Sequence, residues 1–216
     1  MLAYEIQRAK RGDAAANVIV LLHGRGSNRH DLFGLRERLP EEWTVIAPEA
    51  PFPAAPWGYG PGSAWYRFLG RNRPEPESFS ASLRALAEFL GSLPEILGAP
   101  PAQLTVGGFS QGGTLSLGYA LSHPGRAPNV LNFSGFLADH PEVAATPETV
   151  KGSRFFWGHG HLDGNIPFDL AIEGRAALRE AGADLTERDY GIGHWIDPVE
   201  LHDAIDWINA KQDIRS

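Results

Sequence analysis

A serine flanked by glycines is the sequence feature best suited to chemistry. Ser110 stands within Gly108-Phe109-Ser110-Gln111-Gly112, which matches the pattern G-x-S-x-G. A strand-like apolar run precedes this pentapeptide and a helix-like segment follows it, as a nucleophile elbow requires. The sharp turn would hold the hydroxyl beside a helix N-terminus, where developing negative charge is favoured. Ser110 is therefore the candidate nucleophile, and an ordinary glycine-rich strand-to-helix turn is the alternative.

A serine nucleophile needs a base, which in this arrangement comes last along the chain. Of the eight histidines, His194 and His202 follow the last candidate strand. His202 falls inside a terminal helical segment, whereas His194 lies in a glycine-containing loop directly after that strand. We therefore predict that His194 is the base, against the alternative of a structural loop histidine.

The acid that orients the base should follow the preceding strand. Asp163 lies on the loop that comes after the apolar run 155–157. Asp169 is an alternative, but its position after a proline suits the start of a helix. Asp139 follows an earlier strand and is a second alternative. We predict Asp163.

Acyl transfer also needs two backbone donors for the oxyanion. One should be the N–H of Gln111, directly after the serine. The other should come from the loop after the first buried strand, where Arg25 stands between two glycines. The side chain of His23 in this loop is interpreted as structural.

Histidines near the predicted acid raise the possibility of a metal site. His159 and His161 lie close to Asp163 in the sequence, but their spacing differs from the helical H-E-x-x-H arrangement. We expect His159 to pack under the loop that carries Asp163, called the acid loop below, and His161 to face solvent. No metal and no other cofactor is predicted.

Apolar strands and amphipathic helices alternate along the chain and would position the candidate catalytic residues. The pattern predicts strands at 18–22, 43–47, 104–106, 130–133, 155–157 and 185–190, and helices at 79–97, 111–121, 169–181 and 198–210. Strands separated by helices indicate a doubly wound, mostly parallel α/β sheet, with ligands at the carboxyl ends of the strands. We read residues 1–216 as a single domain.

The segment 49–77 is rich in prolines and aromatic residues and has no regular periodicity. It either covers the edge of the sheet as a structural loop or walls a substrate pocket, and the two readings are compatible. Apolar side chains suited to substrate binding are Trp65, Tyr66, Phe68 and Leu69, together with Trp195 beside the predicted base.

Composition excludes several other classes of protein. The chain has 216 residues, 43% of them hydrophobic, which argues against intrinsic disorder. Its net charge of −7 disfavours nucleic-acid binding, and the absence of cysteine excludes thiolate nucleophiles and disulfides. No apolar run approaches the ~18 residues of a membrane-spanning helix. We expect a cytoplasmic protein without integral membrane association.

The chain resembles the phospholipase/carboxylesterase family of small α/β-hydrolases, which includes acyl-protein thioesterases. The resemblance rests on four motifs in order: HGRGSN at 23–28, GFSQGG at 108–113, HGHLDGNIP at 159–167 and the GH pair at 193–194. It implies an α/β-hydrolase without a large cap and ester or thioester hydrolysis without a cofactor. It also implies the same nucleophile, acid, base and oxyanion donors.

We therefore expect a serine carboxylesterase that acts on small-molecule esters with short-to-medium acyl groups. The alternatives are an acyl-protein thioesterase, a lysophospholipase, or a non-catalytic hydrolase-fold binding protein. Loss of a triad residue would favour the last of these, and all three residues are present.

Overall fold

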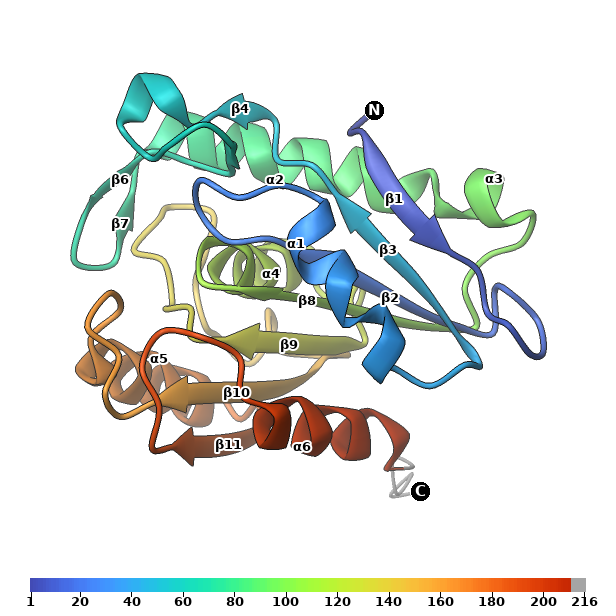
Figure 1. The fold of residues 1–216 in the computed structure, drawn as a ribbon. Coiled ribbons are helices and arrows are strands. Elements are labelled where there is room, and N and C mark those ends of the chain that lie inside the picture. Colours follow the sequence, from blue (N-terminus) through green and yellow to red (C-terminus); the bar gives the residue numbers. More distant parts are fainter. Residues whose placement is uncertain (211–216) are drawn as a thin grey trace.

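The computed structural model describes residues 1–210 and is built around a seven-stranded sheet (Figure 1). The strands are β1 (Tyr4–Gln7), β2 (Asn17–Leu22), β3 (Trp43–Pro48), β8 (Gln103–Phe109), β9 (Asn129–Phe133), β10 (Arg154–Gly160) and β11 (Asp184–Tyr190). Their order across the sheet is β1-β3-β2-β8-β9-β10-β11. Only β1 is antiparallel to its neighbour, so the expected mostly parallel sheet is confirmed. Strand β1 was not predicted from the sequence.

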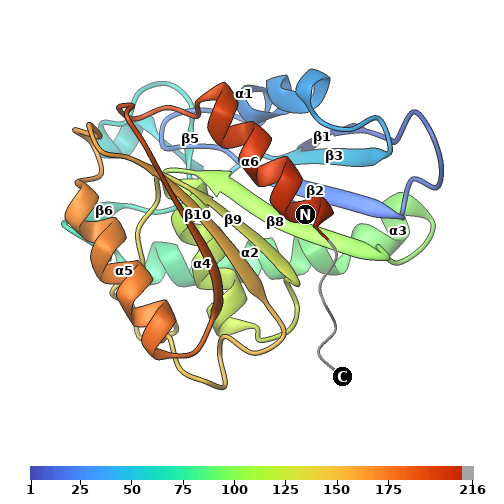
Figure 2. The same cartoon turned by 90° about the horizontal axis from the view of Figure 1, so that it is seen from below.

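Helices cover both faces of this sheet (Figure 2). One face carries α2 (Pro76–Gly91), α4 (Gln111–Ser122) and α5 (Phe168–Glu180), and the other carries α1 (His30–Phe33) and α6 (Pro198–Asn209). Side chains of β2 alternate between the two layers: Val18 and Val20 belong to the first core and Ile19 and Leu21 to the second. Strands buried on both faces read as continuous apolar runs, as the run 18–22 does.

The predicted helix at 79–97 is two helices in the structure. The first, α2, ends at Gly91, and α3 (Leu93–Leu97) follows after Ser92. Pro94 accounts for the break, because proline lacks an N–H and fits only the first turn of a helix. Glu75 is the N-cap of α2.

The segment 49–77 contains only short elements: β4 (Phe52–Pro53), a 3₁₀ turn η2 (Ala55–Trp57), β5 (Ser63–Ala64), β6 (Phe68–Gly70) and β7 (Arg73–Pro74). Another 3₁₀ turn, η1 (Gly34–Arg38), follows α1. The β4–β7 region lies at the end of the molecule toward which the parallel strands point (Figure 1). Residues 134–153 between β9 and β10 contain no helix, and no part of the described chain forms a large cap. None of the described helices has the length and apolar character needed to cross a membrane.

Candidate active site

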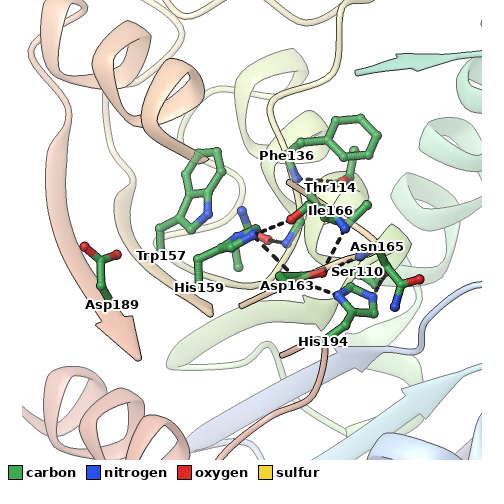
Figure 3. Close-up of polar contacts among 12 residues, drawn as sticks. Ser110, Thr114, Phe136, Trp157, His159, Asp163, Asn165, Ile166, Asp189 and His194 are labelled. Carbon is green, nitrogen blue, oxygen red and sulfur yellow. Dashed lines mark hydrogen bonds and ion pairs between the residues drawn. The ribbon is translucent and has the colours of Figure 1, made fainter. Parts of the chain in front are cut away.

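Three side chains from separate loops meet at the carboxyl end of the sheet (Figure 3). The Nδ1 atom of His194 lies 2.6 Å from Oδ2 of Asp163, and its Nε2 atom lies 3.0 Å from Oγ of Ser110. An ionised carboxylate only accepts hydrogen bonds, so the proton of a neutral His194 is on Nδ1. Nε2 is then free to accept the proton of the Ser110 hydroxyl. The structure thus brings together the residues predicted as nucleophile, base and acid.

Ser110 occupies a strained turn between β8 and α4. Its φ is +56°, in the left-handed region that side-chain-bearing residues rarely adopt. The backbone is fixed there because the Ser110 N–H donates to the carbonyl of Phe133 at 2.8 Å. A Cβ on either Gly108 or Gly112 would overlap the Leu22 carbonyl. The glycines of the motif therefore allow the elbow to pack directly against the end of β2.

Asp163 is held by the loop on which it stands. Its Oδ1 atom accepts hydrogen bonds from the backbone N–H groups of Asn165 and Ile166, at 2.9 and 2.8 Å. Burial opposes ionisation of this carboxyl group. The hydrogen bond from His194 and those from the two amides outweigh burial and hold the pKa of Asp163 below its ordinary value. Asp163 is therefore a carboxylate whose Oδ1 atom binds the two loop amides and whose Oδ2 atom binds His194.

A second histidine, buried behind the acid loop, contacts the backbone and the carboxylate of that loop. His159 is fully buried, and its Nε2 atom lies 2.9 Å from the carbonyl oxygen of Ile166 and 3.6 Å from Oδ2 of Asp163. Burial lowers the pKa of His159, which keeps the ring neutral and its Nε2–H donating to Ile166. His161 is exposed, with its ring 4.5 Å from that of Phe168. No group of side chains suited to hold a metal ion occurs among residues 1–210.

The loop that carries His194 is attached to the acid loop by backbone hydrogen bonds. The N–H of His161 donates to the carbonyl of Tyr190, and the N–H of Leu162 donates to that of Ile192, both at 2.9 Å. The Phe109 ring lies 4.6 Å from the imidazole of His194. The base is therefore positioned both by the acid loop and by the residue that precedes the nucleophile.

Two backbone N–H groups beside Ser110 are available to an oxyanion. Within the described chain, neither the N–H of Arg25 nor that of Gln111 donates to a protein acceptor. Both residues line the cleft around Ser110. The Gln111 N–H also belongs to the first turn of α4, where the helix dipole favours an anion.

His23 stabilises the loop that contains Arg25. The ring is buried, which lowers the pKa of His23 and keeps it neutral. Its Nδ1–H donates to the carbonyl of Gly24 at 2.8 Å, and its Nε2 accepts from the N–H of Ala50 at 3.1 Å. The indole N–H of Trp65 donates to the His23 carbonyl at 2.9 Å. These contacts agree with the structural role expected for His23.

The side chain of Gln111 links the elbow to the aromatic segment. Its Oε1 atom accepts from the N–H of Trp65 at 3.1 Å, and its Nε2 donates to the carbonyl of Tyr66 at 2.7 Å. Trp65 is fully buried behind the cleft and does not line it. Its position supports the structural reading of this segment, whereas Tyr66 and Phe68, which line the cleft, support the substrate-pocket reading.

The cleft itself has a volume of about 340 Å³. Its apolar wall is formed by Tyr66, Phe68, Phe109, Phe136 and Ile166, and its polar wall includes Arg25, Ser27, Asp31 and Asn165. Six of these lining residues were not predicted from the sequence: Ser27, Asp31, Phe109, Phe136, Asn165 and Ile166. All six lie within a few residues of a strand's carboxyl end or of a predicted site residue, and this position in the sequence could have identified them as candidates for the cleft wall.

Besides Trp65, two other residues predicted to bind substrate lie outside this wall. Leu69 is 48% exposed on the β6–β7 hairpin, and Trp195 is 54% exposed on the loop after the base. Neither lines the cleft. Trp195 packs instead close to the backbone of Gly193, where an added Cβ would meet its ring.

The alternatives to the predicted acid and base lie elsewhere. The Asp169 side chain pairs with Arg71 on the protein surface at 3.5 Å. His202 lies on the exposed face of α6, where it pairs with Asp206. Neither takes part in the hydrogen bonds around Ser110, so His194 is the group placed to accept the Ser110 proton, and Asp163 is the carboxylate placed to orient His194.

Comparisons with known proteins agree with this architecture. The chain is 28% identical to acyl-protein thioesterase 1 of Eremothecium gossypii, over 96% of this chain and 93% of the relative. A probable carboxylesterase of Oryza sativa subsp. japonica is also 28% identical, over 96% and 83% of the two chains. Among solved structures, esterase PE8 superposes with a TM-score of 0.80 at 26% identity, covering 96% of this chain and 98% of that one. The model of the family described as Phospholipase/Carboxylesterase matches residues 5–212, so the chain belongs to this family of α/β-hydrolases.

Proposed function

We propose that the protein is a serine carboxylesterase that hydrolyses short-to-medium acyl esters through an acyl-enzyme intermediate. The observation that carries the proposal is the continuous hydrogen-bonded chain from Ser110 through His194 to Asp163. Nucleophile, base and orienting acid within hydrogen-bond reach of one another are the signature of covalent acyl transfer.

In the acylation half of the reaction, Ser110 Oγ attacks the ester carbonyl while its proton passes to Nε2 of His194. The carbonyl oxygen becomes an oxyanion between the N–H groups of Arg25 and Gln111. Asp163 stabilises the imidazolium ion that forms. His194 then gives the proton to the alcohol oxygen, the C–O bond breaks, and the acyl group stays on Ser110.

In the deacylation half, water replaces the serine hydroxyl as the nucleophile. His194 removes one proton from the water as it attacks the acyl-enzyme carbonyl, and the same two N–H groups bind the second oxyanion. Collapse of this intermediate breaks the bond to Ser110 Oγ, which takes the proton back from His194. The products are a carboxylic acid and the free enzyme.

The size of the cleft supports the proposed acyl length. A volume of about 340 Å³ lies at the lower end of the range for ligand pockets, about 300–1,000 Å³. Each CH₂ group transferred from water to the apolar wall contributes about 0.8 kcal/mol, or roughly fourfold in kcat/KM per carbon. The gain should stop when the cleft is full, so long acyl chains should add little.

A thioesterase acting on acylated proteins is the second candidate, and the name of the Eremothecium gossypii relative favours it. The chemistry at Ser110 would be the same, with a thiol as the leaving group. The two candidates are separated by kcat/KM for matched oxygen esters and thioesters, including an S-acylated peptide. A preference for the S-acylated peptide over small esters would favour the thioesterase.

A fluorophosphonate probe tests the catalytic proposal directly. It should label the wild-type chain, and mass spectrometry should locate the adduct on Ser110. Ser110→Ala should prevent labelling and lower kcat for short-chain esters by roughly 10⁴–10⁶-fold. Ser122→Ala, at the far end of α4, is the matched control and should react normally. Labelling at another residue, or more than a tenth of normal turnover in Ser110→Ala, would refute the assignment.

A further inference from the structure

Glu200 is a buried acid that the proposed mechanism does not use. It stands in the first turn of α6, and none of its surface is exposed to solvent. Its Oε1 atom has no hydrogen-bond partner among the described residues. Its Oε2 atom accepts one long bond, 3.4 Å, from the N–H of Asp197. Buried carboxylates normally have several close donors, so this environment suits an uncharged carboxylic acid.

Glu200 packs against the strand that leads into the acid loop. A Cβ on Gly158 of β10 would overlap Oε1 of Glu200, so the absence of a side chain at 158 makes room for the carboxyl group. Five residues farther along the chain is Asp163. The carboxyl group therefore lies between α6 and the base of the acid loop.

Glu200 is also connected to the loop of the predicted base. Asp197 is the N-cap of α6, and its side chain and that of Glu200 form a reciprocal capping box. Only two residues separate Asp197 from His194. A displacement of Glu200 would therefore move the capped start of the helix and, with it, the loop that sets the 3.0 Å contact between His194 and Ser110.

The charged groups around Glu200 favour its neutral form. Asp197, the N-cap of α6, and Asp203, within α6, are both acidic, and the hydroxyl of Tyr190 on β11 donates a hydrogen bond to Asp203. Arg175 on α5 is the cation that acts on Glu200, but its guanidinium already donates to Asp189 and to the carbonyls of Trp157 and Arg188. Among the described residues, the cation that acts on Glu200 thus has both Nη atoms engaged, and only its Nε lacks a hydrogen-bond partner.

We propose that Glu200, in its neutral form, is a positioning residue that keeps the His194 loop in register with the acid loop, so that its ionisation at alkaline pH lowers turnover. This inference rests on the proposed esterase function. A carboxylate at this position would be a buried charge with one long hydrogen bond, from the N–H of Asp197, and outward movement of the helix start would relieve it. A misplacement of catalytic groups by about 1 Å can lower the rate by roughly 10²-fold.

The titration range of Glu200 agrees with this placement. Burial raises the pKa of Glu200 to about 8, and the carboxylates of Asp197 and Asp203 act in the same direction. The chain contains no cysteine, so no thiol titrates in this range. An alkaline loss of activity near this pH would therefore have few other sources.

Glu200→Gln tests the proposal, because glutamine has nearly the same shape and does not ionise. Wild-type kcat should fall by about tenfold or more between pH 7 and pH 10. The variant should remain within about twofold of wild type at pH 7 and lose this alkaline decline. Asp206→Asn removes one charge from an exposed position on the same helix and should keep the wild-type profile. Circular dichroism at each pH would show that the chain stays folded.

Infrared spectroscopy of the wild-type enzyme provides a second measurement that does not depend on the variant folding. The carbonyl band of a protonated carboxylic acid should disappear with the same midpoint as kcat. Absence of such a band at pH 6, or an identical alkaline decline in Glu200→Gln, would overturn the inference. Failure of wild type to react with esters or fluorophosphonates at every pH would instead refute the proposed function.

Discussion

Asp163→Asn is the substitution for which the structure predicts the sharpest effect on turnover. The amides of Asn165 and Ile166 both donate to Oδ1 of Asp163. In the variant they require an oxygen at that position, because an NH₂ group there would face two donors. The new NH₂ group must therefore face Nδ1 of His194, which now has to accept a hydrogen bond. The proton moves to Nε2, and the imidazole can no longer accept a proton from Ser110.

The size of this effect follows from the tautomer and the lost charge. A wrong tautomer and an unstabilised imidazolium lower kcat by up to about 10⁴-fold in triads of this kind. A loss of about 10³–10⁴-fold corresponds to roughly 4–5 kcal/mol of transition-state stabilisation, since each factor of ten is about 1.4 kcal/mol. Stability should change much less, because both loop amides keep an oxygen acceptor.

The assay is kcat for a short-chain ester, measured beside the melting temperature of each variant. Asp139→Asn and Asp169→Asn are matched controls, because they remove the same charge at the alternative positions and should retain near-normal turnover. If Asp163→Asn keeps more than a tenth of normal kcat while folded, the tautomer argument is wrong. If Asp169→Asn or Asp139→Asn loses activity instead, the acid has been misassigned.

Three further predictions concern the cleft, the elbow and the buried acid. Phe136→Ala removes a ring that lines the cleft, so the acyl-chain length with the highest kcat/KM in a series of esters should increase. An unchanged optimal chain length would contradict the placement of Phe136 in the apolar wall of the cleft. Gly112→Ala should lower the free energy of unfolding by about 3 kcal/mol or more in urea, because the new Cβ overlaps the Leu22 carbonyl, whereas Gly34→Ala, with open space around it, should not. The pKa of Glu200 is raised on folding, so the native state holds a proton that the unfolded chain releases, and stability falls as pH rises from about 4.3 to about 8. Between pH 5 and pH 9, the free energy of unfolding of Glu200→Gln, followed in melting experiments, should therefore gain up to a few kcal/mol relative to that of wild type. If the difference between the two free energies stays constant over this range, Glu200 is ionised throughout.

The sheet was predictable because its strands are covered on both faces. Such strands are apolar runs, whereas the partly exposed edge strand β11 was indicated by an alternating pattern, and all six strands that the sequence indicated are present in the structure. The edge strand β1 was missed because its four residues are only partly buried and carry a mixed pattern. The boundary between α2 and α3 was missed because the apolar stripe continues across Ser92, although Pro94 disrupts the helix. Periodicity identifies the buried face of a segment more reliably than its ends.

The site residues differ in how much the sequence could say about them. The meeting of Ser110, Asp163 and His194 was predictable because each stands at or within a few residues of the end of a strand, and the carboxyl ends of parallel strands meet at one edge of the sheet. Trp65 was expected to bind substrate because aromatic residues often line pockets. Its position behind the cleft depends on hydrogen bonds to Gln111 and to the His23 carbonyl, which are far away in the sequence. Local pattern does not distinguish an aromatic residue that faces a ligand from one that supports the wall.

The connections between the loops explain why residues distant from Ser110 should affect turnover. The acid loop and the base loop share backbone hydrogen bonds, including that from Leu162 to Ile192. His159 fixes the far end of the acid loop through the Ile166 carbonyl, and Glu200 packs against Gly158 of β10, the strand that leads into the loop. Because burial disfavours the charged form of both groups, each should support the loops in its neutral form. Protonation of His159 at acidic pH and ionisation of Glu200 at alkaline pH should then weaken the same pair of loops from opposite ends of the pH scale.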